Sequence, residues 1–154
     1  RGRALPKLPP GLAAPADFFE LTFPAEANRP YRLWLRARAQ KNSYNNDSVS
    51  VQFSGSLDQA GLPVVAIGTP GGVPIVLEDC GGCGVSGWGW QDNGYGIGVL
   101  GPTITFGSGG VQTIRIQRRE DGISIDQIVL SPVTYLGTSP GATKNDTRIL
   151  PRTQ

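Results

Sequence analysis

The sequence predicts an all-β fold, a β-sandwich or jelly roll of antiparallel strands with little or no helix. Glycine and proline contribute 22 and 13 of the 154 residues, which is typical of a chain that turns often. Short segments alternate apolar and polar residues with a period of two, and no segment sustains the 3.6-residue period of an amphipathic helix. Roughly eight short strands in one sandwich domain are therefore expected.

The clearest strand signals are FFELTF (18–23) and YRLWLRARA (31–39). The second alternates strictly, so we expect one face in the core and the other in water. The water-facing side carries Arg32, Trp34, Arg36 and Arg38, among which only the tryptophan is expected to pack.

Further strand signals follow after a polar loop, in the segments 48–55, 62–68, 73–79 and 102–106. The last two signals, 111–117 and 122–131, flank the turn residues 119–122, and the whole unit predicts a β-hairpin. In the second of these segments, the alternation of inward-facing residues shifts by one position between Ile125 and Ile128. This shift predicts a bulge or a strand buried on both faces.

Three parts of the chain differ in pattern. Residues 1–16 contain four prolines and no periodicity, so we expect a linker or a loosely held N-terminal edge. Residues 17–136 hold the strand signals of the sandwich domain. Residues 137–154 are rich in turn formers and predict a tail that packs on the domain or leaves it. Because the chain has no Met, we expect it to be cut from a longer protein.

Charge and hydropathy argue against nucleic-acid and membrane partners. The formal net charge is only +2, and the basic residues are not clustered with aromatic residues as in a nucleic-acid interface. No apolar run approaches the ~20 residues that span a bilayer.

The composition also argues against an enzyme. The chain has no His, which excludes Ser-His-Asp and Cys-His nucleophile pairs and imidazole bases. A glycosidase needs only two carboxylates, but the pairs Glu78–Asp79 and Glu120–Asp121 are each adjacent in sequence, so nothing in their spacing favours one.

Cys80 and Cys83 are spaced as CxxC. A zinc site needs two further Cys or His ligands, and a thioredoxin-like motif needs a βαβ context; the sequence offers neither. The favoured interpretation is a local disulfide in a secreted protein, and the alternative is a pair of free, partly buried thiols.

The strongest candidate binding segment is WGWQDNGY (88–95), in which Trp88 and Trp90 share a face if the segment is extended. Aromatic rings stack on the apolar faces of sugars, while amides and carboxylates bind hydroxyls. We therefore predict a sugar-binding platform made of Trp88, Trp90, Gln91, Asp92, Asn93 and Tyr95. The alternative is that one or both tryptophans plug the end of the core.

A second candidate lies in the loop 41–47, where the aromatic ring of Tyr44 stands among amides that include Asn46. This loop equally fits an ordinary Asn-rich turn.

The segments YRLWLRARA, NDSVSVQFSG, GWGWQDNG and IRIQRREDGISIDQIVLS resemble the galactose-binding-like jelly-roll carbohydrate-binding modules of bacterial polysaccharide-degrading proteins. The resemblance covers about residues 18–132 and implies that Ile114–Leu130 form the last core hairpin. It implies no catalysis of the module's own and a covalently linked hydrolase. The acidic first-strand signature of calcium-binding relatives is not recognisable, so a structural calcium ion is left open and no other cofactor is expected.

The expected function is a secreted, non-catalytic module that binds β-1,4-linked glucan chains such as cellulose, mixed-linkage β-glucan or xyloglucan. Two tryptophans two residues apart suit the flat faces of equatorially linked glucose. The alternatives are a polysaccharide hydrolase or lyase on the same fold and a structural or adhesion domain of a secreted protein.

Overall fold

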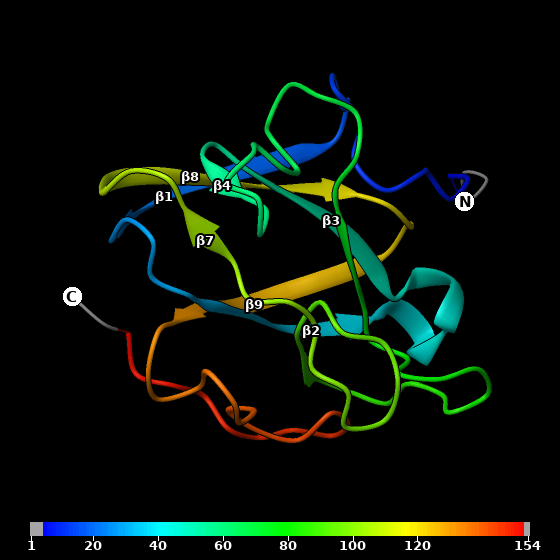
Figure 1. The fold of residues 1–154 in the computed structure, drawn as a ribbon. Helices are drawn as coiled ribbons and strands as arrows, with labels where there is room; N and C mark the ends of the chain where they lie inside the picture. Colours follow the sequence, from blue (N-terminus) through cyan, green and yellow to red (C-terminus); the bar gives the residue numbers. More distant parts are fainter. Residues whose placement is uncertain (1–4, 153–154) are drawn as a thin grey trace.

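The computed structural model describes residues 5–152 and shows two facing antiparallel sheets with a small third one (Figure 1). The first sheet has four strands, in the order β1 (Phe18–Ala25), β8 (Gly110–Arg118), β3 (Ser48–Phe53) and β5 (Val73–Val76). The second has three, in the order β6 (Gly89–Gln91), β2 (Arg32–Ala39) and β9 (Ile123–Ser131). The third pairs β4 (Ser56–Leu57) with β7 (Thr105–Phe106).

Helical structure within the described range is limited to two single 3₁₀ turns, Gln40–Asn42 and Tyr44–Asn46. The predicted all-β sandwich with little or no helix is therefore confirmed.

The main core lies between the two larger sheets and is centred on Phe106, which is fully buried. The rings of Phe23, Tyr31 and Phe53 pack around it edge-on, with centroids 5.5, 5.8 and 5.6 Å away. Edge-to-face packing of this kind adds to the free energy gained by burial alone. The alternating apolar residues of β2, β3 and β8 supply the remaining inward side chains.

The expected hairpin of the last two strands is wrong, because β8 and β9 lie in different sheets. β8 pairs with β1 and β3, whereas β9 pairs with β2. Both strands turn isoleucines into the same core, so the chain crosses from one sheet to the other instead of folding back within one. Glu120 anchors this crossing because its carboxylate accepts hydrogen bonds from the Asp47 N–H (3.1 Å) and the Ser48 hydroxyl (2.7 Å).

The expected strand at 62–68 is also wrong. The segment makes only isolated bridges, between Phe53 and Ala66 and between Leu57 and Pro63. Pro63 has no N–H to donate to a ladder. Val65 has φ 44°, which breaks the extended conformation.

The predicted irregularity in β9 is confirmed as a bulge. In the ladder with β2, Arg36 is opposite Gln127 and Ala37 is opposite Ile125, so Asp126 is the extra residue. The bulge turns the Asp126 carboxylate toward the guanidinium of Arg36, with which it forms an ion pair.

The prediction that the arginine face of β2 is solvated holds for Arg38, which is exposed, and is wrong for the rest of the face. Arg32, Trp34 and Arg36 are only 8%, 4% and 3% exposed. The segment that follows β9 runs across this face as an irregular outer layer (Figure 1). Its Tyr135 carbonyl accepts a hydrogen bond of 2.8 Å from the Trp34 indole N–H, so the tryptophan packs as expected but beneath the tail.

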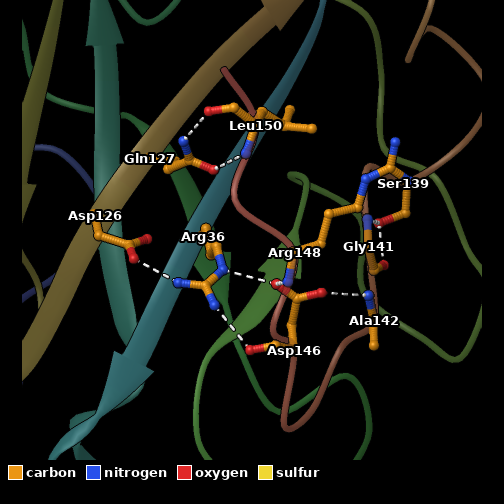
Figure 2. A network of polar contacts seen from close by, with 9 residues as sticks. All are labelled: Arg36, Asp126, Gln127, Ser139, Gly141, Ala142, Asp146, Arg148 and Leu150. Carbon is orange, nitrogen blue, oxygen red and sulfur yellow. Dashed lines mark hydrogen bonds and ion pairs between the residues drawn. The ribbon is translucent and has the colours of Figure 1, made fainter. Parts of the chain in front are cut away.

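Arg36 joins the tail to the sheet (Figure 2). Its Nε donates to the Asp146 carboxylate at 2.7 Å and a terminal nitrogen donates to the Asp146 carbonyl at 2.8 Å. Farther along, the Gln127 side chain exchanges two hydrogen bonds with the backbone of Leu150, at 2.9 and 3.0 Å. The described part of the C-terminal segment, 137–152, therefore packs on the domain.

The N-terminal segment is tied to the outer face of the four-stranded sheet. The Gln117 side chain accepts a hydrogen bond from the Leu12 N–H (2.8 Å) and donates one to the Leu12 carbonyl (3.0 Å). The Leu8 N–H donates to the Arg119 carbonyl at 2.7 Å, and Gly11 lies against the backbone of Gly71. Residues 5–12 thus cover the sheet; residues 1–4 lie outside the described range.

The sandwich is open along the side between the edge strands β1 and β9. A groove of about 440 Å³ lies there, lined on one side by Phe19 and on the other by Ile123 and Ile125. Phe19 and Leu21 of β1 remain 43% and 46% exposed, so the two sheets do not close over their apolar faces here.

We predict that Asp146→Ala lowers the free energy of unfolding by about 3–5 kcal/mol, because it leaves the buried Arg36 with only one carboxylate partner. Urea denaturation followed by circular dichroism measures the loss. Asp17→Ala is the control: its partner is also an arginine, Arg118, but the Asp17 side chain is 55% exposed, so the expected cost is about 0–1 kcal/mol. Equal losses for the two variants would contradict the structural role of Asp146.

Candidate functional site

The segment 88–95 divides between the interior and the surface. Trp90 of β6 is fully buried. A Cβ atom added to Gly141 would lie 2.7 Å from the indole Cδ1, so the C-terminal tail rests directly on the ring. Trp90 therefore presents no face to a ligand, and the structure does not place two neighbouring rings on one open surface.

Gln91 and Asp92 also point inward, being 7% and 2% exposed. The Gln91 amide donates to the Leu77 carbonyl at 3.1 Å. Asp92 accepts hydrogen bonds from the N–H groups of Gly94 (2.9 Å) and Gly101 (2.8 Å), and it pairs with Arg32 at 3.2 Å. Instead of binding hydroxyls, Asp92 holds the loop 92–101 in place and Gln91 ties β6 to the residue that follows β5.

The loop conformation that Asp92 fixes depends on Gly94. A Cβ atom there would lie 2.2 Å from the Val99 carbonyl oxygen and 2.6 Å from the Gly101 nitrogen. The two arms of the loop approach so closely that no other residue fits. Part of the glycine excess in this segment therefore has a local steric cause.

Tyr95 and Asn93 lie on the outside of this loop, in a pocket of about 380 Å³ that we call the Tyr95 pocket. Tyr95 is 60% exposed. The charged lining of the pocket comes from distant parts of the chain, namely Lys7, Asp47, Glu78 and Arg119. The structure thus brings two predicted residues together with Asp47, the last residue of the second candidate loop, and with three residues that the sequence did not single out for binding.

Three carboxylates at the pocket are held by backbone and side-chain donors. Glu78 donates its own N–H to the Asp47 carboxylate (2.9 Å), and its carboxylate accepts the Gly84 N–H (2.9 Å). Lys7 pairs with Glu120 at 3.2 Å. These contacts place Glu78 at the pocket wall and Glu120 behind it.

Asp47 and Glu120 lie side by side and shift each other's pKa in opposite directions. Burial and the hydrogen bond to Glu120 raise the pKa of Asp47 to about 7. Burial alone would also raise the pKa of Glu120, but hydrogen bonds from Asp47, Ser48 and Lys7 outweigh burial and lower it. Near neutral pH, Asp47 is thus the carboxyl that holds the proton and Glu120 the carboxylate that accepts it.

Sequence reasoning missed these groups because no local pattern marks them. Asp47 and Glu120 are 73 residues apart, and Lys7 lies in the proline-rich segment that predicted a linker. Glu78 was considered only for its adjacent partner Asp79, which does not line the pocket. Asp47, Glu78 and Glu120 meet at one end of the four-stranded sheet, where β3 begins and β5 and β8 end, and the hydrogen bond from Leu8 to Arg119 brings Lys7 there.

Apart from Asp47 at its end, the second predicted loop lies outside this pocket. Tyr44 is 62% exposed on its 3₁₀ turn and does not line the Tyr95 pocket. Asn46 donates its amide to the Gln40 carbonyl at 3.2 Å, which supports the turn. Trp88 also lies apart, half-buried beside the guanidinium groups of Arg36 and Arg38.

The predicted disulfide is confirmed between Cys80 and Cys83, whose Cα atoms are 5.3 Å apart. The disulfide closes a ring over residues 80–83. Gly84, which donates its N–H to Glu78, follows directly after this ring. With Asp79, the two sulfur atoms form the one cluster of metal-ligating residue types found within 5–152. Sulfur atoms in a disulfide are not thiolates, so this cluster does not hold a metal while the bond is closed.

Protein-family models, curated proteins and solved structures were compared with the chain, and none of the three comparisons found a match. None of the helical turns within residues 5–152 has the length and apolarity that crossing a membrane requires. No relative therefore assigns a role to these side chains, and the functional conclusion depends on their chemistry.

We predict that Trp90→Ala lowers the free energy of unfolding by about 3–5 kcal/mol, the usual cost of removing a buried aromatic side chain. Trp88→Ala, at a half-buried position, is expected to cost about half as much or less. Urea titration followed by far-ultraviolet circular dichroism compares the two. A Trp90→Ala variant as stable as the unaltered protein would show that the indole is not in the core.

We predict that Asp47→Asn becomes stabilising relative to Asp47 as the pH rises. The folded-state pKa of Asp47, about 7, exceeds its usual value of 3.8, so its contribution is complete at low pH and is lost as the pH rises through 7. An asparagine donates to Glu120 at every pH. The difference in unfolding free energy between variant and parent should shift by roughly 2 kcal/mol from pH 5 to pH 9.

Asp58→Asn, at an exposed turn, is the control and should show the same pH profile as the parent. If the unfolding free energies of Asp47→Asn and Asp58→Asn change with pH in parallel, then burial beside Glu120 does not raise the pKa of Asp47.

Proposed function

We propose that the chain is a non-catalytic carbohydrate-binding domain and that it binds its ligand in the Tyr95 pocket. The observation that carries this proposal is the combination, within one pocket of about 380 Å³, of an exposed aromatic ring with amide, carboxylate and guanidinium groups. The proposal keeps the function expected from the sequence and moves its site away from the two tryptophans.

The chemistry of a sugar matches these groups. One face of a pyranose ring is apolar and stacks on an aromatic side chain, whereas its hydroxyls both donate and accept hydrogen bonds. Tyr95 supplies the ring, Asn93 and Arg119 supply donors, and Glu78 supplies an acceptor. Acceptors and donors on opposite walls can fix the orientation of neighbouring hydroxyls.

The polar groups are held in place before a ligand arrives. Glu78 is fixed through Gly84 and Asp47, and Asn93 donates its amide to the Pro102 carbonyl at 3.0 Å. Arg119 donates to the Ser48 hydroxyl at 2.8 Å. Side chains that are already ordered lose little entropy on binding, which favours affinity.

The proposed ligands are β-1,4-linked glucan chains, namely cellulose oligomers, mixed-linkage β-glucan and xyloglucan. The pocket lies in the range of about 300–1,000 Å³ that small-ligand sites occupy. With one ring in a pocket rather than two on a platform, we expect a short stretch of a soluble chain to bind rather than the face of a crystal.

The cellular setting is part of the proposal. A closed disulfide between Cys80 and Cys83 is typical of an oxidising compartment and supports secretion. A domain that binds a glycan without cleaving it is useful when it is joined to a hydrolase that does, because the tether keeps the enzyme at its substrate.

A hydrolase is the second candidate, because Asp47, with a pKa of about 7, lines the same pocket as Glu78. A protonated carboxyl and a nearby carboxylate are the groups that glycosidases use. Against this, Asp47 is 2% exposed and its carboxyl is engaged by the Glu78 N–H and by Glu120. Release of reducing ends from β-glucan, abolished in Asp47→Asn, would favour this second function.

We predict that Tyr95→Ala weakens retardation in native gels containing soluble β-glucan by about five- to tenfold in affinity, the loss expected for one aromatic contact of ~1–1.5 kcal/mol. Tyr44→Ala is the matched control, since its ring is exposed to the same degree but lies outside the pocket. Unchanged melting curves would show that both variants fold.

Retardation that survives in Tyr95→Ala but is lost in Tyr44→Ala would place the site on the 41–47 loop. No retardation of the unaltered protein by any glycan would overturn the proposal and favour a structural or adhesion domain.

A further inference from the structure

Trp88 and Arg38 form a second feature, outside the Tyr95 pocket. Gly89 of β6 pairs with Ala37 of β2, which brings the preceding Trp88 beside the arginines of β2. The guanidinium carbons of Arg36 and Arg38 lie over its ring, 5.1 and 5.0 Å from the centroid. Trp88 is half-buried, so part of the indole is open to solvent.

The two arginines differ in their partners. Arg36 is 3% exposed, and its guanidinium binds Asp126 and Asp146. Arg38 is exposed, and its guanidinium has no ion pair with any carboxylate in the described chain. Its guanidinium instead lies over the Trp88 ring. The cationic group at this position is therefore available for a ligand.

A guanidinium over an aromatic ring is well suited to a carboxylate. The ring attracts the cation from one side, while the N–H groups at the edge of the guanidinium plane remain free to donate two parallel hydrogen bonds. Because the tryptophan restricts the arginine, less side-chain entropy is lost when an anion binds. Arg38 is thus partly ordered for bidentate binding of an anion.

The amides around Trp88 are arranged as donors as well. The Asn42 carbonyl oxygen accepts the Gly87 N–H (3.0 Å), and the Asn145 carbonyl oxygen accepts the Ser86 hydroxyl (2.8 Å). With both oxygens occupied, each side chain has its NH₂ group left for a ligand. Donors next to an unpaired cation favour a ligand that carries negative charge and acceptor oxygens.

We propose that Trp88, Arg38, Asn42 and Asn145, the Trp88 surface, bind a uronic acid residue of an acidic polysaccharide. The indole packs on the sugar ring and Arg38 binds its carboxylate. A neutral glucan chain would leave the guanidinium of Arg38 without an anionic partner, and with Trp90 buried this surface offers it a single ring. The inference rests on the proposed function in taking the domain to bind glycans, but it does not depend on the Tyr95 pocket.

Isothermal titration calorimetry with tetragalacturonate and with cellotetraose tests this proposal. We expect Arg38→Gln to weaken tetragalacturonate binding at least about tenfold, as for the loss of a charge-assisted hydrogen bond, and to leave cellotetraose binding unchanged. Arg38→Lys keeps the charge but cannot donate two parallel hydrogen bonds from one plane, so an intermediate loss of affinity is expected. Tyr95→Ala should affect cellotetraose alone.

Arg148→Gln is the matched control. Like Arg38, Arg148 is an exposed arginine, but it lies in the C-terminal tail and its guanidinium is not over the Trp88 ring. Its binding of tetragalacturonate should equal that of the unaltered protein. Equal losses in Arg38→Gln and Arg148→Gln would show general charge attraction and overturn the proposal. So would the absence of tetragalacturonate binding, or its loss in Tyr95→Ala.

The two proposals can fail separately. If cellotetraose does not bind while tetragalacturonate binds and is lost in Arg38→Gln, the Tyr95 pocket is wrong and the Trp88 surface stands. If cellotetraose binds and depends on Tyr95 while tetragalacturonate does not bind, the Tyr95 pocket stands and the Trp88 surface is wrong.

Discussion

The buried guanidinium of Arg36 is the constraint on which much of this structure depends. A charge that is 3% exposed must be paired, and here Asp126 and Asp146 supply the carboxylates. Burial alone would raise the pKa of Asp146, but hydrogen bonds from Arg36 and from the backbone outweigh burial and lower the pKa, so the carboxylate stays charged. The bulge in β9 and the path of the C-terminal tail both serve this pairing, because each delivers one of the two carboxylates. The sheet therefore cannot be separated from the tail without taking one of its two carboxylate partners from Arg36.

The covering tail also decides which aromatic groups remain open to ligands. Trp34 and Trp90 lie on the face that the tail covers, and both are part of the interior. Trp88 lies at the start of β6 and keeps part of its ring at the surface, while Tyr95 is carried outward by the loop that Asp92 holds. The Tyr95 pocket and the Trp88 surface are thus consequences of the same packing: each uses what the tail leaves uncovered.

The sequence predicted features that depend on near neighbours and failed on those that depend on distant ones. The alternation of 31–39, the phase slip before Ile128 and the CxxC spacing are local, and each predicted its structure correctly. The solvated arginine face and the last hairpin were wrong because the partners that decide them lie far along the chain, as with Arg36 and Asp146, which are 110 residues apart. Of the predicted binding platform, Asn93 and Tyr95 meet in a pocket, whereas its charged lining could not be predicted because the pairing of distant strands in the four-stranded sheet assembles it.

Asp146 follows Arg36 by 110 residues, and this order affects how the domain is made. The ribosome completes β2 long before it reaches the tail, so the Arg36 side chain emerges without its main partner. Until residues up to about Leu150 have left the exit tunnel, the outer face of β2 has neither its cover nor the second carboxylate. The final packing of this sheet therefore follows the synthesis of the tail, and a nascent chain stalled before Asp146 would leave Trp34 and Trp90 uncovered and Arg36 with only one carboxylate partner.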